Sequence, residues 1–289
     1  MKRSTTRVSE LEAPVPGDDL GVLLWDKPAG PTSHDVIGQI RRATGLRAGH
    51  AGTLDPFATG LLVVLLGRAT RLQRYLVGLP KTYLATARYG WTSTTGDRDG
   101  ELEETGRIPD SLEIASGEFE QQVPMTSAVK VSGERLYRKA HRGEAVSDRP
   151  TREVTVHRSQ LVDLEENPDG SPRRGRYELE VSSGTYVRNL VSDLGDAYCE
   201  ELRRTSVGSL DVRSSGSLVD PVEALSFLPK LVLEEDESGA IANGVPVATR
   251  PDLEEGVAVR LVAGDNLVGV GRTAGDSVRP EVVLRPAAG

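Results

Sequence analysis

The sequence predicts an α+β fold, and three observations support this prediction. Apolar runs typical of strands and amphipathic stretches typical of helices follow one another without the strict alternation of parallel βαβ units. The chain has 289 residues, 37% hydrophobic and 27% charged, as in an ordinary globular protein of one or two domains. Its longest apolar run, residues 61–66, is far shorter than the roughly 20 residues needed to cross a bilayer.

The chain begins with a predicted tail, strand and helix. Residues 1–19 contain Ser, Thr, Glu, Pro, Gly and Asp among few apolar residues, which predicts a mobile tail. Residues 21–25 form a short apolar run stopped by Asp-Lys-Pro, which is typical of a buried strand. Thr32 or Ser33 is expected to cap a helix that ends near Gly45.

A glycine-rich loop, residues 49–60, leads into an apolar strand at residues 61–66. A helix is predicted over residues 69–76, with Arg68, Arg71 and Arg74 available to solvent. Residues 81–89 alternate between apolar and polar, which places Tyr83 and Tyr89 on one face of a strand.

The next stretch is less regular. Acidic residues 92–106 indicate a long loop or a hairpin tip, and Thr185 is a candidate cap for a further helix. The other expected elements are helices at 111–119 and 134–142 and strands at 154–164 and 176–181.

The last part of the chain changes in character after residue 228. Short Val-rich runs are separated there by Gly, Asp and Asn, which predicts a small β-rich module docked on the larger domain. We therefore expect a tail at 1–19, a main domain at 20–228 and a module at 229–289. The Val-rich runs are residues 257–262, 267–270 and 282–284.

The charge distribution leaves a nucleic-acid partner open. The formal net charge is -8, yet residues 20–90 hold nine basic and three acidic residues, and residues 125–158 hold eight and four. Residues 91–120 hold two basic and nine acidic residues. Such blocks can fold into one basic face that attracts a polyanion, or they can form separate solvated faces.

Several classes of site lack support. The single cysteine, Cys199, excludes an intramolecular disulfide and a multi-thiolate zinc site. The four histidines lie far apart in sequence, and no glycine-rich nucleotide-binding motif is present. We therefore expect no metal and no nucleotide cofactor.

The glycine-rich loop carries the strongest candidate for chemistry. Pro56 favours an extended conformation for Asp55, and the loop glycines permit positive φ. Asp55 is thus presented on a stiff loop that enters a buried strand, where a nucleophile or base could act. Alternatively, Asp55 is a turn residue that hydrogen-bonds its own backbone. His50 is equally open, because a loop histidine is often only a hydrogen-bonding fixture.

Residues 49–62, Gly-His-Ala-Gly-Thr-Leu-Asp-Pro-Phe-Ala-Thr-Gly-Leu-Leu, resemble the signature loop of the TruB family of tRNA pseudouridine synthases. The similarity extends over about residues 21–210, and residues 242–247 resemble part of the family's PUA-type RNA-binding domain. Five further stretches match family motifs in the family's order: residues 26–33, 81–83, 127–133, 184–188 and 202–205.

The resemblance implies a defined reaction and fold. The fold is a pseudouridine synthase catalytic domain with a mixed or antiparallel sheet and flanking helices, followed by the PUA-like module. The T-loop uridine at tRNA position 55 is isomerised: the C1'–N1 bond breaks, the uracil rotates, and C5 bonds to C1'. No cofactor is required. Because the base lies in a folded loop, it must be flipped out of the RNA.

The resemblance also implies the site residues. Asp55 is the nucleophile, Arg188 pairs with its carboxylate and keeps it ionised, and Tyr83 stacks on the uracil. The substrate-binding positions are His50, Tyr186, Leu202 and Lys130. Lys130 either contacts a phosphate or braces its loop. Residues 123–126 depart from the family's Val-Pro-Pro-x-Tyr form, because the aromatic is missing.

The expected partner is the T-arm of tRNA, bound by a cytoplasmic monomer without a membrane or nucleotide cofactor. Three rival interpretations remain. One is a synthase of the same fold that acts in a guide-RNA complex on ribosomal RNA. Another is an RNA-binding or RNA-folding protein that has lost catalysis. The third is a glycoside or nucleoside hydrolase built around Asp55, although no acid partner is identifiable.

Overall fold

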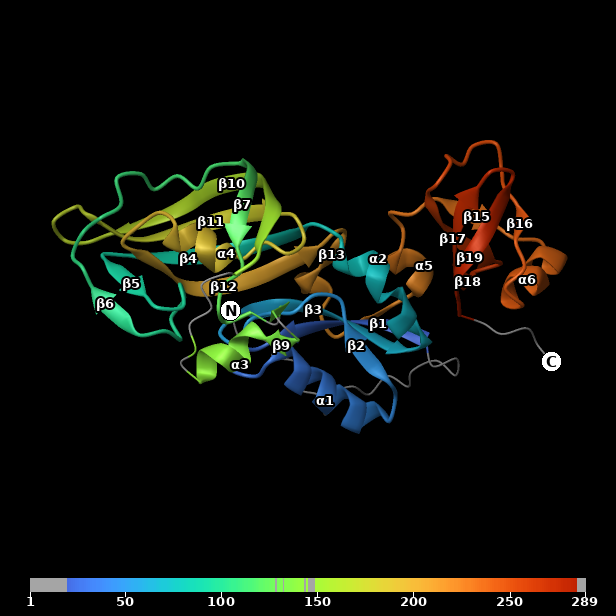
Figure 1. Cartoon of the computed structure of the whole chain (residues 1–289), viewed down its shortest axis with the longest axis horizontal. Coiled ribbons are helices and arrows are strands. Elements are labelled where there is room, and N and C mark those ends of the chain that lie inside the picture. Colours follow the sequence, from blue (N-terminus) through green and yellow to red (C-terminus); the bar gives the residue numbers. More distant parts are fainter. Residues whose placement is uncertain (1–19, 128, 132, 143, 145–148, 285–289) are drawn as a thin grey trace.

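A computed structural model describes residues 20–284 except 128, 132, 143 and 145–148, so the tail predicted at 1–19 lies outside the described residues. Figure 1 shows a large body built on one extended sheet and a smaller β unit at its side. Strands dominate and the helices are short, which confirms the predicted α+β class. No helix in the described part of the chain is long and apolar enough to cross a membrane.

The large sheet contains ten strands in the order β14-β1-β3-β12-β4-β11-β10-β7, with β2 paired to β3 and β13 to β12. It is mixed, because β12 runs parallel to β3 while its other neighbours pair antiparallel. The strands are β1 (Leu20–Lys27), β2 (Ala48–His50), β3 (Thr59–Gly67), β4 (Lys81–Tyr89), β7 (Gly117–Gln122), β10 (Thr151–Glu166), β11 (Pro172–Val181), β12 (Ala197–Val207), β13 (Leu210–Asp211) and β14 (Leu218–Val219).

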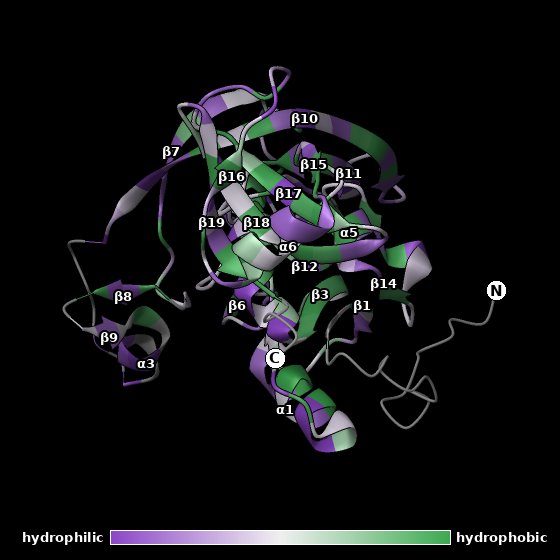
Figure 2. Cartoon of the chain, turned by 90° about the vertical axis from the view of Figure 1, so that its right-hand side faces the viewer, coloured by the Kyte–Doolittle hydropathy of each residue, from purple (hydrophilic) through white to green (hydrophobic). Residues whose placement is uncertain are grey.

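Short helices and two small hairpins complete the large body. The hairpins pair β5 (Trp91–Ser93) with β6 (Leu102–Glu104) and β8 (Lys130–Val131) with β9 (Glu134–Arg135). Figure 2 shows β8, β9 and α3 projecting to one side. The helices are α1 (Ser33–Thr44), α2 (Gln73–Val77), α3 (Leu136–His141), α4 (Val187–Ser192) and α5 (Pro221–Ala224), with 3-10 turns η2 (Arg68–Leu72) and η3 (Val212–Ser214).

Helix α1 forms where its capping signals predict. Of the two candidate caps, Thr32 takes the role, and it exchanges hydrogen bonds with Asp35 in a capping box. The helix ends at Gly45, whose φ of 70° is left-handed. Its apolar face is buried against β1 and β3, so it covers one side of the sheet next to the glycine-rich loop.

Four predicted elements differ in the structure. No helix forms over 111–119: Gly117 adopts a φ of 134°, and β7 begins there because its backbone pairs with β10. The helix at 134–142 is shorter, since residues 134–135 belong to β9. Residues 69–76 divide into η2 and α2. Thr185 does not cap α4, because its hydroxyl donates to the carbonyl of Ser182, and Tyr186 is the N-cap.

The smaller unit is a five-stranded sheet in the order β15-β17-β18-β19-β16, with one helix, α6 (Glu235–Ala242). Its apolar residues share a buried cluster with β3, η2, α2 and α5 of the large body. Arg68 and Arg71, which are exposed as predicted, also donate to the carbonyls of Leu284 and Val283 in this unit. The strands are β15 (Lys230–Val232), β16 (Val247–Ala248), β17 (Ala258–Ala263), β18 (Asn266–Ala274) and β19 (Ser277–Val283).

Candidate active site

Asp55 lies in the loop that joins β2 to β3 and lines a cavity of about 980 Å³. About a quarter of its side chain is exposed, at 26%. His50 and Arg188 line the same cavity, together with polar residues from the start of α1 and from the β5–β6 hairpin. The cavity therefore brings together three of the residues that the sequence singled out.

Buried polar side chains anchor one half of the Asp55 loop. The ammonium group of Lys27, at the end of β1, donates to the carbonyls of Pro56 and Ala58 at 3.1 and 2.8 Å. Ser33, at the start of α1, accepts from the amide of Leu54 and donates to its carbonyl. Because these partners flank Asp55 on both sides, the loop backbone is fixed where the carboxylate leaves it.

Arg204 of β12 anchors the start of the same loop and the strand β3 that follows it. It is 1% exposed and donates to the carbonyls of Leu61 at 2.7 Å and Gly52 at 3.0 Å. Gly60 is required beside it, because a Cβ at that position would lie 2.2 Å from the Arg204 carbonyl oxygen. The preceding residue on β12, Arg203, faces the other way and forms a two-pronged ion pair with Asp26.

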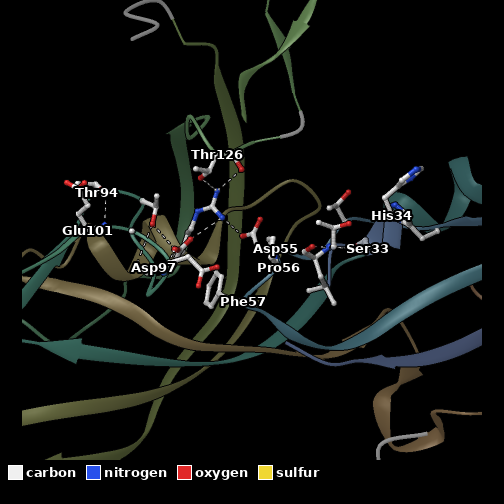
Figure 3. Close-up of a pocket in the computed structure, with 17 residues that line it drawn as sticks. Ser33, His34, Asp55, Pro56, Phe57, Thr94, Asp97, Glu101 and Thr126 are labelled. Atoms are coloured by element: carbon white, nitrogen blue, oxygen red, sulfur yellow. Dashed lines mark hydrogen bonds and ion pairs between the residues drawn. The ribbon is translucent and has the colours of Figure 1, made fainter. Parts of the chain in front are cut away.

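Arg188 occupies the centre of the site. Its guanidinium is 2% exposed and donates to the carboxylate of Asp55, while Asp97 lies 3.5 Å away on the same nitrogen. Its other terminal nitrogen donates to the hydroxyl of Thr126 at 2.9 Å. Figure 3 shows Asp55, Asp97 and Thr126 arranged around this one guanidinium.

The electrostatics of the site combine burial with opposite charge. Burial raises the pKa of the Asp55 carboxyl, and the adjacent Arg188 guanidinium opposes that rise by favouring the charged form. Burial lowers the pKa of Lys27 to about 8, an effect that Asp55 partly offsets. Burial also lowers the pKa of His50, with Arg204 adding to the effect, so its imidazole is neutral at pH 7.

The remaining predicted residues, Tyr83, Leu202, Tyr186 and Lys130, are not among those that line the cavity. Tyr83 and Leu202 are 8% and 6% exposed and belong to a buried cluster that also contains Leu54 and Phe57, the neighbours of Asp55. The ring of Tyr186 lies 5.7 Å from the guanidinium carbon of Arg188. Lys130 is exposed on the β8–β9 hairpin and does not line the cavity.

Sequence reasoning missed two residues that contact Arg188. Asp97 is 4% exposed and accepts hydrogen bonds from the hydroxyl of Thr95 and the amide of Asp99. Its place in a Thr-Thr-Gly-Asp turn is the available signal, but it lies in an acidic stretch for which the sequence predicts only a long loop or a hairpin tip. Thr126 carried no recognisable signal beyond its departure from the family motif.

The arrangement suits chemistry at an electron-poor carbon. A carboxylate held beside a buried guanidinium stays available to attack such a carbon or to stabilise positive charge that develops there. Among the described residues, no group of three or more His, Cys, Asp or Glu side chains is placed to hold a metal ion.

Comparison with solved structures supports the fold. A Cbf5–Nop10–Gar1 complex superposes with a TM-score of 0.69 at 24% identity, covering 97% of this chain and 88% of that one. An H/ACA RNP bound to a substrate RNA containing 2'-deoxyuridine gives 0.69 at 22% identity, with 99% and 92% covered. The predicted fold, a synthase domain followed by a small β unit, is confirmed.

Sequence comparison identifies the family. The model of the TruB family pseudouridylate synthase (N terminal domain) matches residues 40–187. The tRNA pseudouridine synthase B of Arthrobacter sp. (strain FB24) is 37% identical, with 92% of this chain and 97% of that protein covered. The enzyme of the same name from Thermobifida fusca (strain YX) is 41% identical, with 86% of each covered. The chain therefore belongs to the TruB family of pseudouridylate synthases, which are RNA-modifying isomerases.

Proposed function

We propose that this chain isomerises the T-loop uridine of tRNA, at tRNA position 55, to pseudouridine. The observation that carries the proposal is the contact between Asp55 and Arg188 at the wall of the cavity. It occurs in a chain that is 37% and 41% identical to two tRNA pseudouridine synthases B.

The reaction needs no redox change and no net hydrolysis. The C1'–N1 bond breaks, the uracil rotates, C5 bonds to C1', the C5 proton leaves to solvent, and N1 takes up a proton. Cleavage develops oxocarbenium character at C1', which the Asp55 carboxylate stabilises or attacks. Covalent addition at C1' and deprotonation at C2' through a glycal are both compatible with a carboxylate at this position.

Arg188 keeps Asp55 ionised in this proposal. Burial raises the pKa of the Asp55 carboxyl and so favours its neutral form, and a neutral acid neither attacks C1' nor stabilises a cation. The guanidinium contact supplies that charge, and the anchored loop holds the carboxylate in place.

The aromatic and apolar residues bind the flipped nucleotide. Tyr83 is assigned to stack on the uracil, and Leu202 and Tyr186 to pack around it. Tyr83 and Leu202 share a buried apolar cluster with Leu54, next to Asp55, and the ring of Tyr186 lies beside the Arg188 guanidinium. His50 lines the cavity and contacts the flipped nucleotide in this proposal. Flipping costs about a few kcal/mol of unstacking, which these contacts must offset.

RNA affinity comes from basic residues outside the cavity. Arg42, Arg47 and Arg74 are exposed in the first basic block, and Lys130 and Arg152 are exposed in the second. Such residues contact phosphates, so they set affinity and its salt dependence without entering the chemistry.

We also propose the division of the chain into a catalytic domain at 20–228 and an RNA-binding, PUA-like module at 229–289. The separate five-stranded sheet supports this division. The shared apolar cluster indicates that the module keeps a fixed position on the large body.

The decisive experiment measures tritium release from a T-arm RNA hairpin labelled at uracil C5, with no metal or cofactor added. We expect release by the wild type and none by Asp55→Asn. Tight RNA binding without release by the wild type would instead favour an RNA-binding or RNA-folding protein. Release that requires a guide RNA would favour the guide-dependent synthase, and release of free uracil would favour a hydrolase.

A further inference from the structure

The two terminal nitrogens of the Arg188 guanidinium contact different partners. Nη1 faces Asp55 and lies 3.5 Å from Asp97. Among the described residues, Nη2 donates only to Thr126. The Thr126 hydroxyl accepts at 2.9 Å and its carbonyl at 3.4 Å. Within the described part of the chain, Nε has no hydrogen-bond partner, so Thr126 is what fixes the second nitrogen.

The geometry of arginine makes that second contact important. The group is planar with its N–H donors in a fixed fork, so holding one terminal nitrogen orients the other. The ring of Tyr186 lies 5.7 Å from the guanidinium carbon and does not supply a hydrogen bond to fix rotation of the fork. The contact with Thr126 therefore sets which nitrogen faces Asp55.

Thr126 is itself held against the start of α4 by its neighbours. Gln121 is 6% exposed, accepts from the amide of Tyr186 at 2.7 Å and donates to its carbonyl at 3.0 Å. Ser127 is 3% exposed and shares a hydrogen bond with the Tyr186 hydroxyl. Residues of the segment 121–127 therefore hydrogen-bond to the start of the helix that carries Arg188.

We propose that Thr126 is a positioning residue for catalysis, which acts by holding the Arg188 guanidinium so that Nη1 faces the Asp55 carboxylate. This inference rests on the proposed function, because it gives the Asp55–Arg188 contact a catalytic purpose. Thr126 does not touch the reacting atoms in this assignment. Its hydroxyl is the part that matters, since its carbonyl bond is longer and is retained by any substitution.

Two variants separate the hydroxyl from the shape of the side chain. Thr126→Val keeps the branched shape and removes the hydroxyl, and Thr126→Ser keeps the hydroxyl. Thr44→Val is the matched control, because the Thr44 hydroxyl, at the end of α1, also accepts a hydrogen bond, from the amide of Leu46 at 3.2 Å, and does not line the cavity. Each variant is assayed as full chain with the T-arm hairpin under single-turnover conditions, and its Kd for that RNA is measured.

We expect Thr126→Val to lower the single-turnover rate about tenfold, the loss of one hydrogen bond to a charged group. Its Kd for the hairpin should stay within about twofold of wild type, and Thr126→Ser and Thr44→Val should keep rates within about threefold. A wild-type rate in Thr126→Val overturns the proposal. So does an equal loss in the Val and Ser variants.

A pH profile distinguishes positioning from a structural effect. Asp55 is faced by Arg188 from α4, Asp97 from the turn after β5, and Lys27 from β1. Of these groups, Thr126→Val loosens only Arg188. Because the charge of Arg188 lowers the Asp55 pKa, the pKa of Asp55 should rise in the variant. The acid limb of the pH–rate profile should therefore move to higher pH. An acid limb that stays at its wild-type position overturns the proposal.

The Asp55 pKa itself provides a readout that does not need turnover. Titration of the Asp55 carboxyl carbon by NMR, in wild type and in Thr126→Val without RNA, should show a higher pKa in the variant. If the wild type fails to modify any T-arm RNA, the proposed function fails, and this titration still decides the positioning role. Identical titrations in the two proteins overturn it.

Discussion

Two segments of the large body are held in contrasting ways. The Asp55 loop, residues 51–58, is hydrogen-bonded through Lys27, Ser33 and Arg204 to three elements distant in sequence, and all three side chains are buried. The projecting segment, residues 129–144, has exposed ion pairs that join Arg142 to Glu134 and Glu144, all within the segment. The first is fixed by buried contacts with the body of the protein, whereas these ion pairs of the second are exposed and local.

This difference matches what each segment has to do in the proposed reaction. A carboxylate must be held closely to accelerate chemistry at C1', because small misplacements cost large factors in rate. A surface that meets RNA phosphates tolerates local variation, since its electrostatic contribution depends little on fine geometry. The predictions below test the contrast between the two segments.

Asp55→Asn should have the largest effect on the fixed loop. The amide is isosteric but uncharged, so we expect the single-turnover rate to fall at least about a thousandfold while the Kd for T-arm RNA changes less than about threefold. Tritium release under single-turnover conditions provides the measurement. Asp196→Asn, which removes an exposed ion pair with Arg107, serves as the control. Turnover near the wild-type rate in Asp55→Asn would remove the proposed nucleophile.

Arg188→Met should lower the rate about a hundredfold, because the pKa of Asp55, already raised by burial, loses the charge that opposes the rise. The carboxylate is lost as pH falls through its folded pKa, so the acid limb of the pH–rate profile should shift to higher pH in the variant. A rate profile measured between pH 5 and 9 checks this. Unchanged activity would mean that Asp55 stays ionised without its partner.

Arg204→Met should destabilise the fold by about 2–4 kcal/mol, since the carbonyls of Gly52 and Leu61 lose a buried donor. The neighbouring Arg203→Met is a natural comparison, because its ion pair with Asp26 is partly exposed and should contribute less than about 1 kcal/mol. Urea unfolding of both variants gives the two values. Equal losses would contradict the importance assigned to burial.

The pH dependence of stability should report the buried ammonium of Lys27. Its folded pKa of about 8 lies below the 10.5 of the unfolded chain, so between these values the unfolded state binds more protons. The free energy of unfolding of wild type, relative to Lys27→Met, should therefore rise by about 2 kcal/mol between pH 8 and pH 10.5. Urea titrations at several pH values test this. A flat difference would indicate a normal lysine pKa.

Arg142→Ala should have the smallest effect. The ion pairs of Arg142 are exposed and confined to the projecting segment, so we expect the melting temperature to stay within about 1 °C of wild type. Calorimetry provides the comparison, with Glu134→Gln as the complementary variant. A drop comparable with that of Arg204→Met would show that the projecting segment is integrated into the fold.

The sequence predicted those elements whose signals lie within a few consecutive residues, such as an alternation of apolar and polar residues or a helix cap. Strand β4 alternates residue by residue in burial, as its apolar and polar residues indicated, and α1 carries its own cap and stop. Strand β12 was missed because its charged residues come in adjacent pairs, 200–201 and 203–204, which break the alternation. Its arginines are accommodated by partners on β1 and in the Asp55 loop that no local pattern reveals.

The same distinction between local patterns and contacts distant in sequence applies to the site. From the residues alone, Asp55 remained one of two possibilities, and only the resemblance to a family indicated Arg188 as its partner. Asp97 and Thr126 reach Arg188 from segments about 90 and 60 positions earlier in the chain. Contacts at such separations are set by the sheet topology, which brings β7, the β5–β6 hairpin and α4 together, and no spacing in the sequence encodes them directly.

Because two arginines are adjacent on β12, the contacts of this strand depend more on its register than on its composition. Arg203 and Arg204 are chemically identical, yet one forms a partly exposed ion pair and the other anchors the Asp55 loop from the interior. A single-residue deletion ahead of them would turn the side chain of Arg203 to the inner face of the strand and that of Arg204 to the outer face. Each face would still carry an arginine, but at a different position along the strand. Leu202 is buried in the core on this strand, and the pairing with β4 is irregular between residues 199 and 201 and between 204 and 206, so a shift of one residue would disturb both. This protein should therefore tolerate many substitutions along β12 better than one insertion or deletion.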